Sequence, residues 1–338
     1  MNNQDNIKCY IPKIAKGRMV YSPSYKTRVL EYYFKRYALK DSCIKQIPVQ
    51  ASMVTIFDNL KKTLRTQHEY TYILRLDIKN FFGTIKTNRM VSLLSTYTDE
   101  FGLELAKEYF LKERFVTGST LSNLFASIYI KDALDEFNEQ GLKYLRYVDD
   151  FIFFCTSEEN AKETLKKVTA IFDKYDLAIN EKNYIRDKRD SHNLFLGFNF
   201  FYYEQRKNVI IKCKKNTQKK IEKRYQLMKN ELYDMYLQGK NSDDELNTFI
   251  RKLNNYTLNI FYIYYNISSS LASDFKFSNR IIKDMANLIG FTGQRIYKTR
   301  NSGAIYLLYD DTFSLNLLPD YIYLLDGSHI FKNAHSTF

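Results

Sequence analysis

The chain has 338 residues, a net charge of +13 and a hydrophobic fraction of 45%. These values fit one large domain or two to three closely packed subdomains, with enough apolar side chains for a folded core. The positive charge favours a polyanionic partner, either nucleic acid or an acidic membrane face. No long uncharged apolar run occurs and the amino-terminal residues are polar, so we expect no membrane span, no signal peptide and a cytoplasmic location.

The amino-terminal part is predicted to mix a β-hairpin, a strand and several helices. The hairpin covers residues 8–22, with a turn at 15–17. A β-rich strand at 71–78 ends on Asp77, and two helical stretches at 86–114 are separated by a polar break near Thr98. Further helices, the first with an apolar and aromatic stripe, are expected at 24–40, 55–67 and 119–138.

The carboxy-terminal part is predicted to become helical. Residues 142–155 indicate an apolar strand, an acidic turn and a second apolar strand. A second hairpin is expected from a strand at 193–203 and a strand at 208–213. Helices are expected at 157–176, 215–238, 243–265 and 276–289, followed by strands at 304–309 and 321–325.

The cysteines and histidines are scattered. The sequence has no C-x-x-C pair and no histidine spaced with a cysteine or a second histidine as a metal pair would be. This spacing predicts neither a zinc site nor a disulfide framework. We expect buried thiols among Cys9, Cys43, Cys155 and Cys213.

Three carboxylates form the most informative pattern. Asp149 and Asp150 lie between two apolar runs, and Asp77 closes another apolar strand. Each has an ordinary alternative explanation, because aspartate favours turns, strand ends and helix caps. Together they are the oxygen-rich ligand set that two Mg²⁺ ions require for phosphoryl transfer.

Six segments in chain order resemble the motifs of reverse transcriptases, together covering about residues 8–203. The segments are IPKIAKGRMVYSP at 11–23, LDIKNFF at 76–82, TGSTLSNLFASIYI at 117–130, YVDD at 147–150, NEK at 180–182 and NLFLGF at 193–198. The resemblance implies an α+β right-hand polymerase fold with fingers, an antiparallel palm sheet and a helical thumb. The implied boundaries are 1–70 for the fingers, 71–203 for the palm with a finger-side helical insertion at 86–114, 204–290 for the thumb and 291–338 for an extension.

The same resemblance implies the catalytic and metal-binding residues. Asp77, Asp149 and Asp150 match the ligands of two Mg²⁺ ions, for which Mn²⁺ is a substitute, and the backbone carbonyl of Ile78 is a further ligand. Phe82 matches the aromatic gate that crowds a ribose 2′-hydroxyl, with core packing as the alternative. We expect the neighbouring Phe81 to point into the core.

Nucleotide contacts are implied for a second group of residues. Lys13 and Arg18, on opposite arms of the first hairpin, match residues that clamp the incoming triphosphate, or else form a solvated basic hairpin. Lys182 matches a lysine near the leaving pyrophosphate, although a surface lysine is equally compatible. Gly118 is expected to allow close approach to the nascent base pair.

Two positions depart from the family pattern. Thr117 stands where many members have glutamine, and Asn123 replaces a usual proline. These departures put fidelity or template dependence in question, and they favour a compact defence-associated enzyme over a retron enzyme.

The segment after the second hairpin is strongly basic. A lysine-rich helix there is expected to contact the phosphates of a template–primer duplex, with a solvated charged face as the alternative. The candidate nucleic-acid-binding residues are Lys214, Lys215, Lys219, Lys220 and Lys223. Dense aromatic residues at 256–265 are expected to be core rather than a base-stacking surface.

The leading hypothesis is an RNA-directed DNA polymerase that copies a structured noncoding RNA in antiphage defence. Expected partners are template RNA, a DNA product or primer and dNTPs, with a homo-oligomer or a partner defence protein also compatible and no membrane. Untemplated or protein-primed DNA synthesis on the same fold is one alternative. A non-catalytic RNA-binding protein with a polymerase fold is another.

Overall fold

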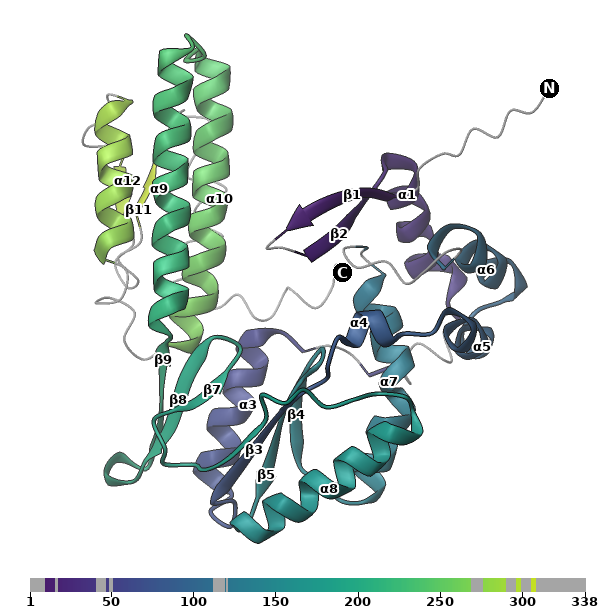
Figure 1. Ribbon diagram of the computed structural model, residues 1–338. Coiled ribbons are helices and arrows are strands. Elements are labelled where there is room, and N and C mark those ends of the chain that lie inside the picture. Colours follow the sequence, from purple (N-terminus) through teal and green to yellow (C-terminus); the bar gives the residue numbers. More distant parts are fainter. Residues whose placement is uncertain are drawn as a thin grey trace, which may run out of the picture. The chain divides into compact units, whose positions relative to one another are not determined.

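The structure is a computed structural model (Figure 1). It describes residues 10–15, 18–40, 47–48, 51–111, 119, 121–268, 276–289, 296–298 and 305–307. The chain divides into two compact units, Met1–Leu60 with Gln67–Lys188, and Lys61–Thr66 with Arg189–Phe338. Each unit is described by itself.

The first unit begins with the predicted hairpin. Strands β1 (Tyr10–Ala15) and β2 (Arg18–Pro23) pair antiparallel, which confirms that expectation. Helix α1 (Tyr25–Tyr33) follows and continues as the π-helical turn η1 (Phe34–Ala38). Ser24 caps α1, because its Oγ accepts a hydrogen bond from the Thr27 amide at 3.2 Å.

The other small helices of this unit also agree with the sequence pattern. Helix α3 covers Met53–Thr66, of which only the residues up to Leu60 belong to this unit. Helices α5 (Thr87–Tyr97) and α6 (Glu100–Leu105) are separated at the predicted polar break. Asp99 starts α6 by accepting a hydrogen bond from the Gly102 amide at 2.7 Å. A π-helical turn, η2 (Ala106–Phe110), extends α6, and a one-turn helix, α4 (Phe81–Thr84), was not predicted.

A four-stranded antiparallel sheet forms the centre of the first unit. Its strand order is β4-β5-β3-β6, formed by Tyr144–Tyr147, Asp150–Cys155, Tyr72–Asp77 and Tyr184–Asp187. The predicted strand–turn–strand segment and the strand ending on Asp77 are thereby confirmed. Strand β6 was not predicted, since all four of its residues are only half-buried and their pattern is weakly apolar.

Two long helices complete the core of this unit. Helix α8 (Glu158–Lys174) packs against one face of the sheet, and α7 (Ser122–Glu139) contacts α8 (Figure 1). Aromatic rings join these layers: the Phe137 ring lies 5.5 Å from that of Phe153 and 5.3 Å from that of Phe172, centroid to centroid. Both predicted helices are confirmed, and the packed sheet gives the catalytic candidates a rigid base.

The second unit contains a three-stranded sheet where the sequence predicted two strands. Its order is β7-β8-β9, formed by Asn193–Phe195, Phe198–Tyr203 and Asn208–Cys213, and the helical turn η3 (Glu204–Arg206) connects the last two. The single strand expected at 193–203 is wrong. Leu196 and Gly197 have φ values of +47° and +86°, so they form a two-residue turn that folds the segment back on itself.

Three helices form the rest of the second unit's described core. They are α9 (Lys215–Leu237), α10 (Asp243–Ile267) and α12 (Lys276–Leu288), as the sequence predicted (Figure 1). Helix α9 buries Ile221, Tyr225, Met228 and Leu232 at helical spacing. The Tyr225 hydroxyl lies 3.1 Å from Thr257 Oγ1 on α10, and Lys229 pairs with Asp284 of α12 at 2.8 Å.

The last described elements are the paired strands β10 (Ile296–Lys298) and β11 (Ile305–Leu307). Strand β11 confirms the strand expected at 304–309, whereas the one expected at 321–325 lies outside the described residues. Along the chain, the first unit ends at Lys188, so β7, β8 and β9 group with the helices of the second unit. The predicted fingers, palm and thumb boundaries stay predictions.

The described residues include two of the four cysteines. Cys155 and Cys213 are buried free thiols, as expected, while Cys9 and Cys43 lie outside the described residues. Among the helices that the structure describes, none has both the length and the apolar character needed to cross a bilayer.

Candidate active site

The carboxylate-bearing residues meet at one end of the central sheet. Asp77, the last residue of β3, is paired in register with Asp150, the first residue of β5. Paired residues on adjacent antiparallel strands project to the same face of the sheet. The Ile78 amide donates a hydrogen bond to the Asp149 carbonyl at 3.1 Å, which joins the third aspartate's backbone to the same corner.

The turn between β4 and β5 holds Asp149 in a strained backbone. Tyr147 pairs with Asp150, so Val148 and Asp149 form a two-residue connection. Val148 has a φ of +56°, a region that β-branched residues rarely occupy and that costs about 1–3 kcal/mol. The Arg146 Nε–H stabilises this turn by donating a hydrogen bond to the Val148 carbonyl at 2.7 Å.

Arg146 remains charged in this position. Burial lowers the pKa of its guanidinium to about 10, while Tyr144 and the Asp149 carboxylate act in the opposite direction. At neutral pH the side chain is therefore a cation directly behind the acidic turn. It partly balances the negative charge that Asp149 brings to the site.

Arg75 contacts the candidate site, and the sequence pattern did not indicate this residue. Its guanidinium forms an ion pair with the Asp150 carboxylate, and its Nη1 donates a hydrogen bond to the Lys182 carbonyl at 3.3 Å. Burial raises the pKa of Asp150 above its usual range, Arg75 opposes that shift, and the nearby Asp77 adds to it. The signal that was available is a lone cation in an apolar strand, two residues before Asp77 on the same face.

Asn180 orients Asp77. Its backbone amide donates to the Asp77 carbonyl at 2.7 Å, and its Nδ2 donates to Asp77 Oδ2 at 3.0 Å. Its Oδ1 accepts a hydrogen bond from the Lys182 amide at 3.3 Å. The short motif at 180–182 therefore supports the Asp77 carboxylate through Asn180, a contact that the sequence did not predict. Lys182 is exposed, and its expected place near the leaving pyrophosphate stays a prediction.

The donor chemistry at this corner fits divalent cations. Carboxylate oxygens are hard ligands of the kind that Mg²⁺ prefers. Within the residues that the structure describes, however, no group of three or more His, Cys, Asp or Glu side chains is arranged to hold an ion. The Asp150 carboxylate is paired with Arg75 instead. Ligation by Asp77, Asp149, Asp150 and the Ile78 carbonyl stays a prediction.

The residues after Asp77 form a tight turn that leads into α4, the helix that carries Phe81 and Phe82. Asn80 has a φ of +48° and precedes α4, and the Thr84 hydroxyl donates to the Phe81 carbonyl at 2.7 Å. Phe81 is only 1% exposed and lies in the core, as expected, whereas Phe82 is half-buried. The exposure leaves Phe82 accessible from outside the core, and its role as a gate stays a prediction.

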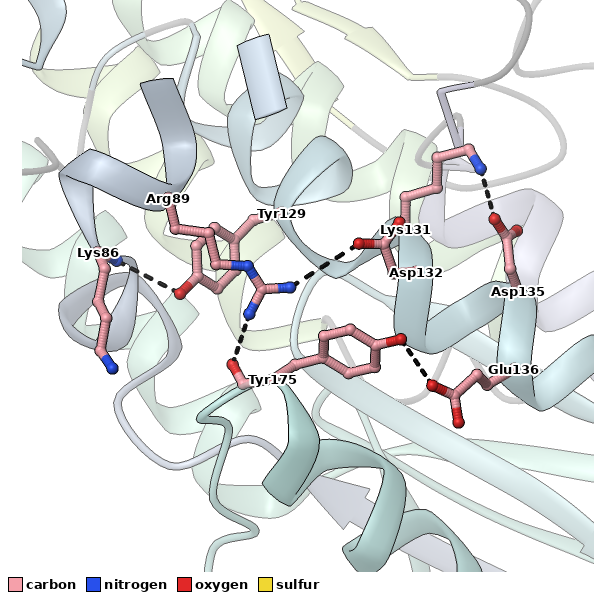
Figure 2. A network of polar contacts seen from close by, with 8 residues as sticks. All are labelled: Lys86, Arg89, Tyr129, Lys131, Asp132, Asp135, Glu136 and Tyr175. Carbon is pink, nitrogen blue, oxygen red and sulfur yellow. Dashed lines mark hydrogen bonds and ion pairs between the residues drawn. The ribbon is translucent and has the colours of Figure 1, made fainter. Parts of the chain in front are cut away.

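A polar and aromatic network holds the helix that follows this turn (Figure 2). Arg89 of α5 lies between the Tyr129 and Tyr175 rings, with its Cζ 4.7 Å and 5.0 Å from their centroids, and Nη1 donates to the Tyr175 carbonyl at 3.0 Å. The Tyr175 hydroxyl donates to Glu136 at 2.6 Å, and the Lys86 amide contacts the Tyr129 hydroxyl at 3.4 Å. The network fixes α5 to the middle of α7 and to the carboxy-terminal end of α8.

The remaining nucleotide-binding candidates are only partly described. Lys13 of β1 is paired with Val20 and Arg18 of β2 with Ala15, so both lie in the hairpin, but their side chains lie outside the described residues. Gly118 and Thr117 also lie outside them.

The predicted nucleic-acid-binding lysines lie at the start of α9, in the second unit. Four of the five are exposed and one is half-buried, the condition that contact with phosphates requires. The exposed residues are Lys215, Lys219, Lys220 and Lys223, and the half-buried one is Lys214. Binding itself stays a prediction.

Comparison with protein families gives a match over the same region. The model described as "Reverse transcriptase (RNA-dependent DNA polymerase)" matches residues 11–199, more than half of the chain. The chain belongs to the reverse transcriptase family. Its α+β architecture with an antiparallel central sheet is that of a polymerase palm, as expected. Family members are nucleotidyltransferases that synthesise DNA on RNA and use divalent metal ions.

Solved structures similar to this reverse transcriptase include telomerases. Apo telomerase from Candida tropicalis is 12% identical, with a TM-score of 0.46, 85% of this chain covered and 62% of that chain. Telomerase from Candida albicans with a TWJ fragment of telomeric RNA is 12% identical, with a TM-score of 0.43, 83% of this chain and 64% of that chain covered. The chain thus spans about three-fifths of the telomerases' length. No curated protein matches the sequence.

Proposed function

We propose that this reverse transcriptase is an active RNA-directed DNA polymerase that joins dNTPs to a hydroxyl primer with two Mg²⁺ ions. The observation that supports this most directly is the convergence of Asp77, Asp149 and Asp150 at one end of the sheet. An RNA-binding protein without catalysis has no need for such a cluster. Burying adjacent carboxylates costs free energy unless cations or positive side chains compensate for them.

The chain's own residues have separate tasks in this proposal. Asp77, Asp149, Asp150 and the Ile78 carbonyl hold the divalent cations, which when bound stabilise charge on the attacking and leaving oxygens. Asn180 orients the Asp77 carboxylate through its Nδ2, and Arg75 neutralises Asp150. Positioning and charge stabilisation of this kind account for most of the rate of phosphoryl transfer.

We assign substrate binding to residues that match the family's motifs. In this proposal Lys13, Arg18 and the exposed Lys182 contact the triphosphate, Phe82 selects against a ribose 2′-hydroxyl, and Gly118 approaches the nascent base pair. The exposed lysines of α9 contact the phosphates of the template–primer duplex. Such contacts are independent of sequence and weaken with salt.

The test is DNA synthesis by matched variants. Asp149→Asn removes a metal ligand while keeping the side chain's shape, and Asp173→Asn makes the same change at an exposed position of α8. With Mg²⁺, dNTPs and the RNA that copurifies with the protein, we expect Asp149→Asn to lose incorporation by at least about a hundredfold. RNA binding should remain in both variants, and Asp173→Asn should retain full activity.

The same assay identifies the alternatives. If the wild-type protein makes no DNA under these conditions, the polymerase proposal fails. DNA that stays attached to the protein after denaturation would instead indicate protein priming. Synthesis that does not depend on RNA would indicate an untemplated enzyme.

We further propose a cytoplasmic role in antiphage defence, with a structured noncoding RNA as the template. The support is the resemblance to compact defence-associated reverse transcriptases and the departures at Thr117 and Asn123. Cells that express the wild-type protein should resist at least one phage that infects cells expressing Asp149→Asn. Equal plaque numbers for the two variants across a broad phage panel would contradict this role.

A further inference from the structure

Helix α1 and the turn η1 expose a row of aromatic side chains. Tyr25 is 82% exposed, Tyr32 65%, Tyr33 40% and Tyr37 63%. Their spacing along the helix places them on one face, together with Val29, which is 51% exposed. A contiguous exposed apolar surface of this kind usually marks an interaction site.

The opposite face of the same helix is buried and includes a carboxylate. Glu31 is fully buried and Thr27 is 2% exposed, while Phe34 packs edge-on against Phe110 and Phe125 with ring centroids 5.6 Å away in each case. The Ser119 hydroxyl donates a hydrogen bond to Glu31 at 2.6 Å. The helix therefore buries a glutamate and presents tyrosines, the reverse of the usual arrangement.

The exposed charge on this segment is entirely positive. The acidic residue within 25–40 is Glu31, and it is buried. The exposed charged side chains of the same segment are Lys26, Arg28, Lys35, Arg36 and Lys40. An aromatic surface with this charge is complementary to a polyanion, and it disfavours a second copy of the same basic face.

The rings are near enough to act together. The Tyr33 and Tyr37 centroids are 5.3 Å apart, and Phe101 of α6, itself 62% exposed, lies 6.1 Å from Tyr33 in an edge-on arrangement. Exposed Glu100 and Glu104 flank Phe101, so the positive character belongs to α1 and η1 rather than to α6. The α1–η1 face, defined as the exposed tyrosines and basic side chains between Tyr25 and Lys40, thus combines adjacent rings with cations.

We propose that the α1–η1 face binds single-stranded RNA, with bases stacked on the tyrosines and phosphates held by the basic side chains. Unpaired bases can stack on aromatic rings, whereas the bases of a duplex are already stacked on one another. The phenol hydroxyls can both donate to and accept from a ribose 2′-hydroxyl. The choice of RNA over DNA rests on the proposed function, whereas the inference that this face binds a single-stranded nucleic acid does not.

The test measures binding apart from catalysis, in full-length protein that carries Asp149→Asn. The probe is a labelled single-stranded RNA of mixed sequence, with the corresponding blunt RNA duplex and a DNA strand of the same sequence as comparisons. Tyr32→Ser/Tyr37→Ser should weaken single-strand binding at least about tenfold, because stacking contributes ~1–3 kcal/mol per base. Tyr32→Phe/Tyr37→Phe keeps the rings and should stay within about threefold. Tyr233→Ser, at a 44% exposed tyrosine near the end of α9 that lies farthest from the lysines proposed to contact the duplex, is the control and should change nothing.

Salt dependence separates the two kinds of contact. Lys35→Gln/Arg36→Gln should reduce the slope of log K against log salt by about 1.4, since each phosphate contact to a single strand contributes about 0.7. The tyrosine variants should leave the slope unchanged. Circular dichroism and the size of the particle in solution are measured for every variant.

Four results would overturn the inference. The first is that Tyr32→Ser/Tyr37→Ser binds RNA no more weakly than Tyr233→Ser, and the second is that the phenylalanine and serine variants lose RNA binding equally. The third is that the DNA strand binds as tightly as the RNA strand and is weakened as much by the serine substitutions. The fourth is a change of oligomeric state with RNA binding unaltered. The last result would identify the face as an interface between copies. If RNA binding behaves as described but wild-type protein makes no DNA, the proposed polymerase function fails and this inference stands.

Discussion

The ion pair between Arg75 and Asp150 should be an energetically coupled unit at the centre of the site. Replacing Arg75 with methionine removes the charge and keeps a side chain of similar length. The Asp150 carboxylate would then lie beside Asp77 without its cation. We expect the Arg75→Met protein to fold but to be less stable than the wild type at neutral pH.

The magnitude follows from the burial of the pair. Removing one partner of a fully buried ion pair costs about 3–5 kcal/mol. Here the Arg75 and Asp150 side chains keep 19% and 23% of their surface exposed, so solvent screens part of the charge. We therefore expect Arg75→Met to lower the free energy of unfolding by about 2 kcal/mol.

A double-mutant cycle measures the coupling. Arg75→Met, Asp150→Asn and the double variant are unfolded in urea without divalent cations, and the double variant should be more stable than the sum of the single losses by about 1–2 kcal/mol. The pH dependence has a defined sign. The folded-state pKa of Asp150 is raised, so its contribution to stability is fully present below about pH 3.9 and is lost as the pH rises through the folded pKa.

Because Arg75 opposes that rise in pKa, removing it raises the folded-state pKa of Asp150 further. The loss of stability then extends to higher pH. The difference between wild type and Arg75→Met should therefore be small in acid and grow as Asp150 ionises. A coupling below about 0.5 kcal/mol would refute the reasoning, since distant sites commonly add to within that value. A difference in stability that does not change with pH would refute it as well.

Three further outcomes test the fold around the site. Gly197→Ala should cost about 1–2 kcal/mol in urea unfolding, because φ is +86° there, and an unchanged midpoint would contradict the turn between β7 and β8. Tyr225→Phe should cost about 1 kcal/mol by removing the hydroxyl that lies 3.1 Å from Thr257 Oγ1, while a more stable variant would contradict that contact. Burial raises the pKa of Cys155 to about 11, so its thiol should resist alkylation at pH 8 until the protein unfolds. Mass spectrometry of the peptide that contains Cys155 measures this labelling. Rapid labelling of the native protein would contradict the burial of this thiol.

Local patterns in the sequence were sufficient for the elements that carry the aspartates. Apolar runs that end on acidic residues predicted β3, β4 and β5, and helical periodicity predicted α7, α8 and α9. The turn at Leu196 and Gly197 escaped prediction because one glycine within an apolar run also fits a continuous strand. Strand β6 escaped because its residues are half-buried at a sheet edge and show no strong alternation.

The supporting side chains depend on contacts between distant segments. Arg75 reaches Asp150 and Lys182, and Asn180 reaches Asp77, across more than 70 residues of sequence in each case. Charge and spacing along the chain do not encode such partners. The orientation of α1 has the same origin, because the hydrogen bond from Ser119 to Glu31 selects which face of that helix is buried.

The left-handed backbone at Val148 determines when the conformational entropy of the turn that carries Asp149 is lost. Glycine would adopt this φ without strain, but it would also let the turn sample many conformations. Valine restricts the turn, since its branched side chain packs against the core. The entropy lost in aligning Asp149 is then incurred once, when the chain folds, rather than in every round of cation and nucleotide binding.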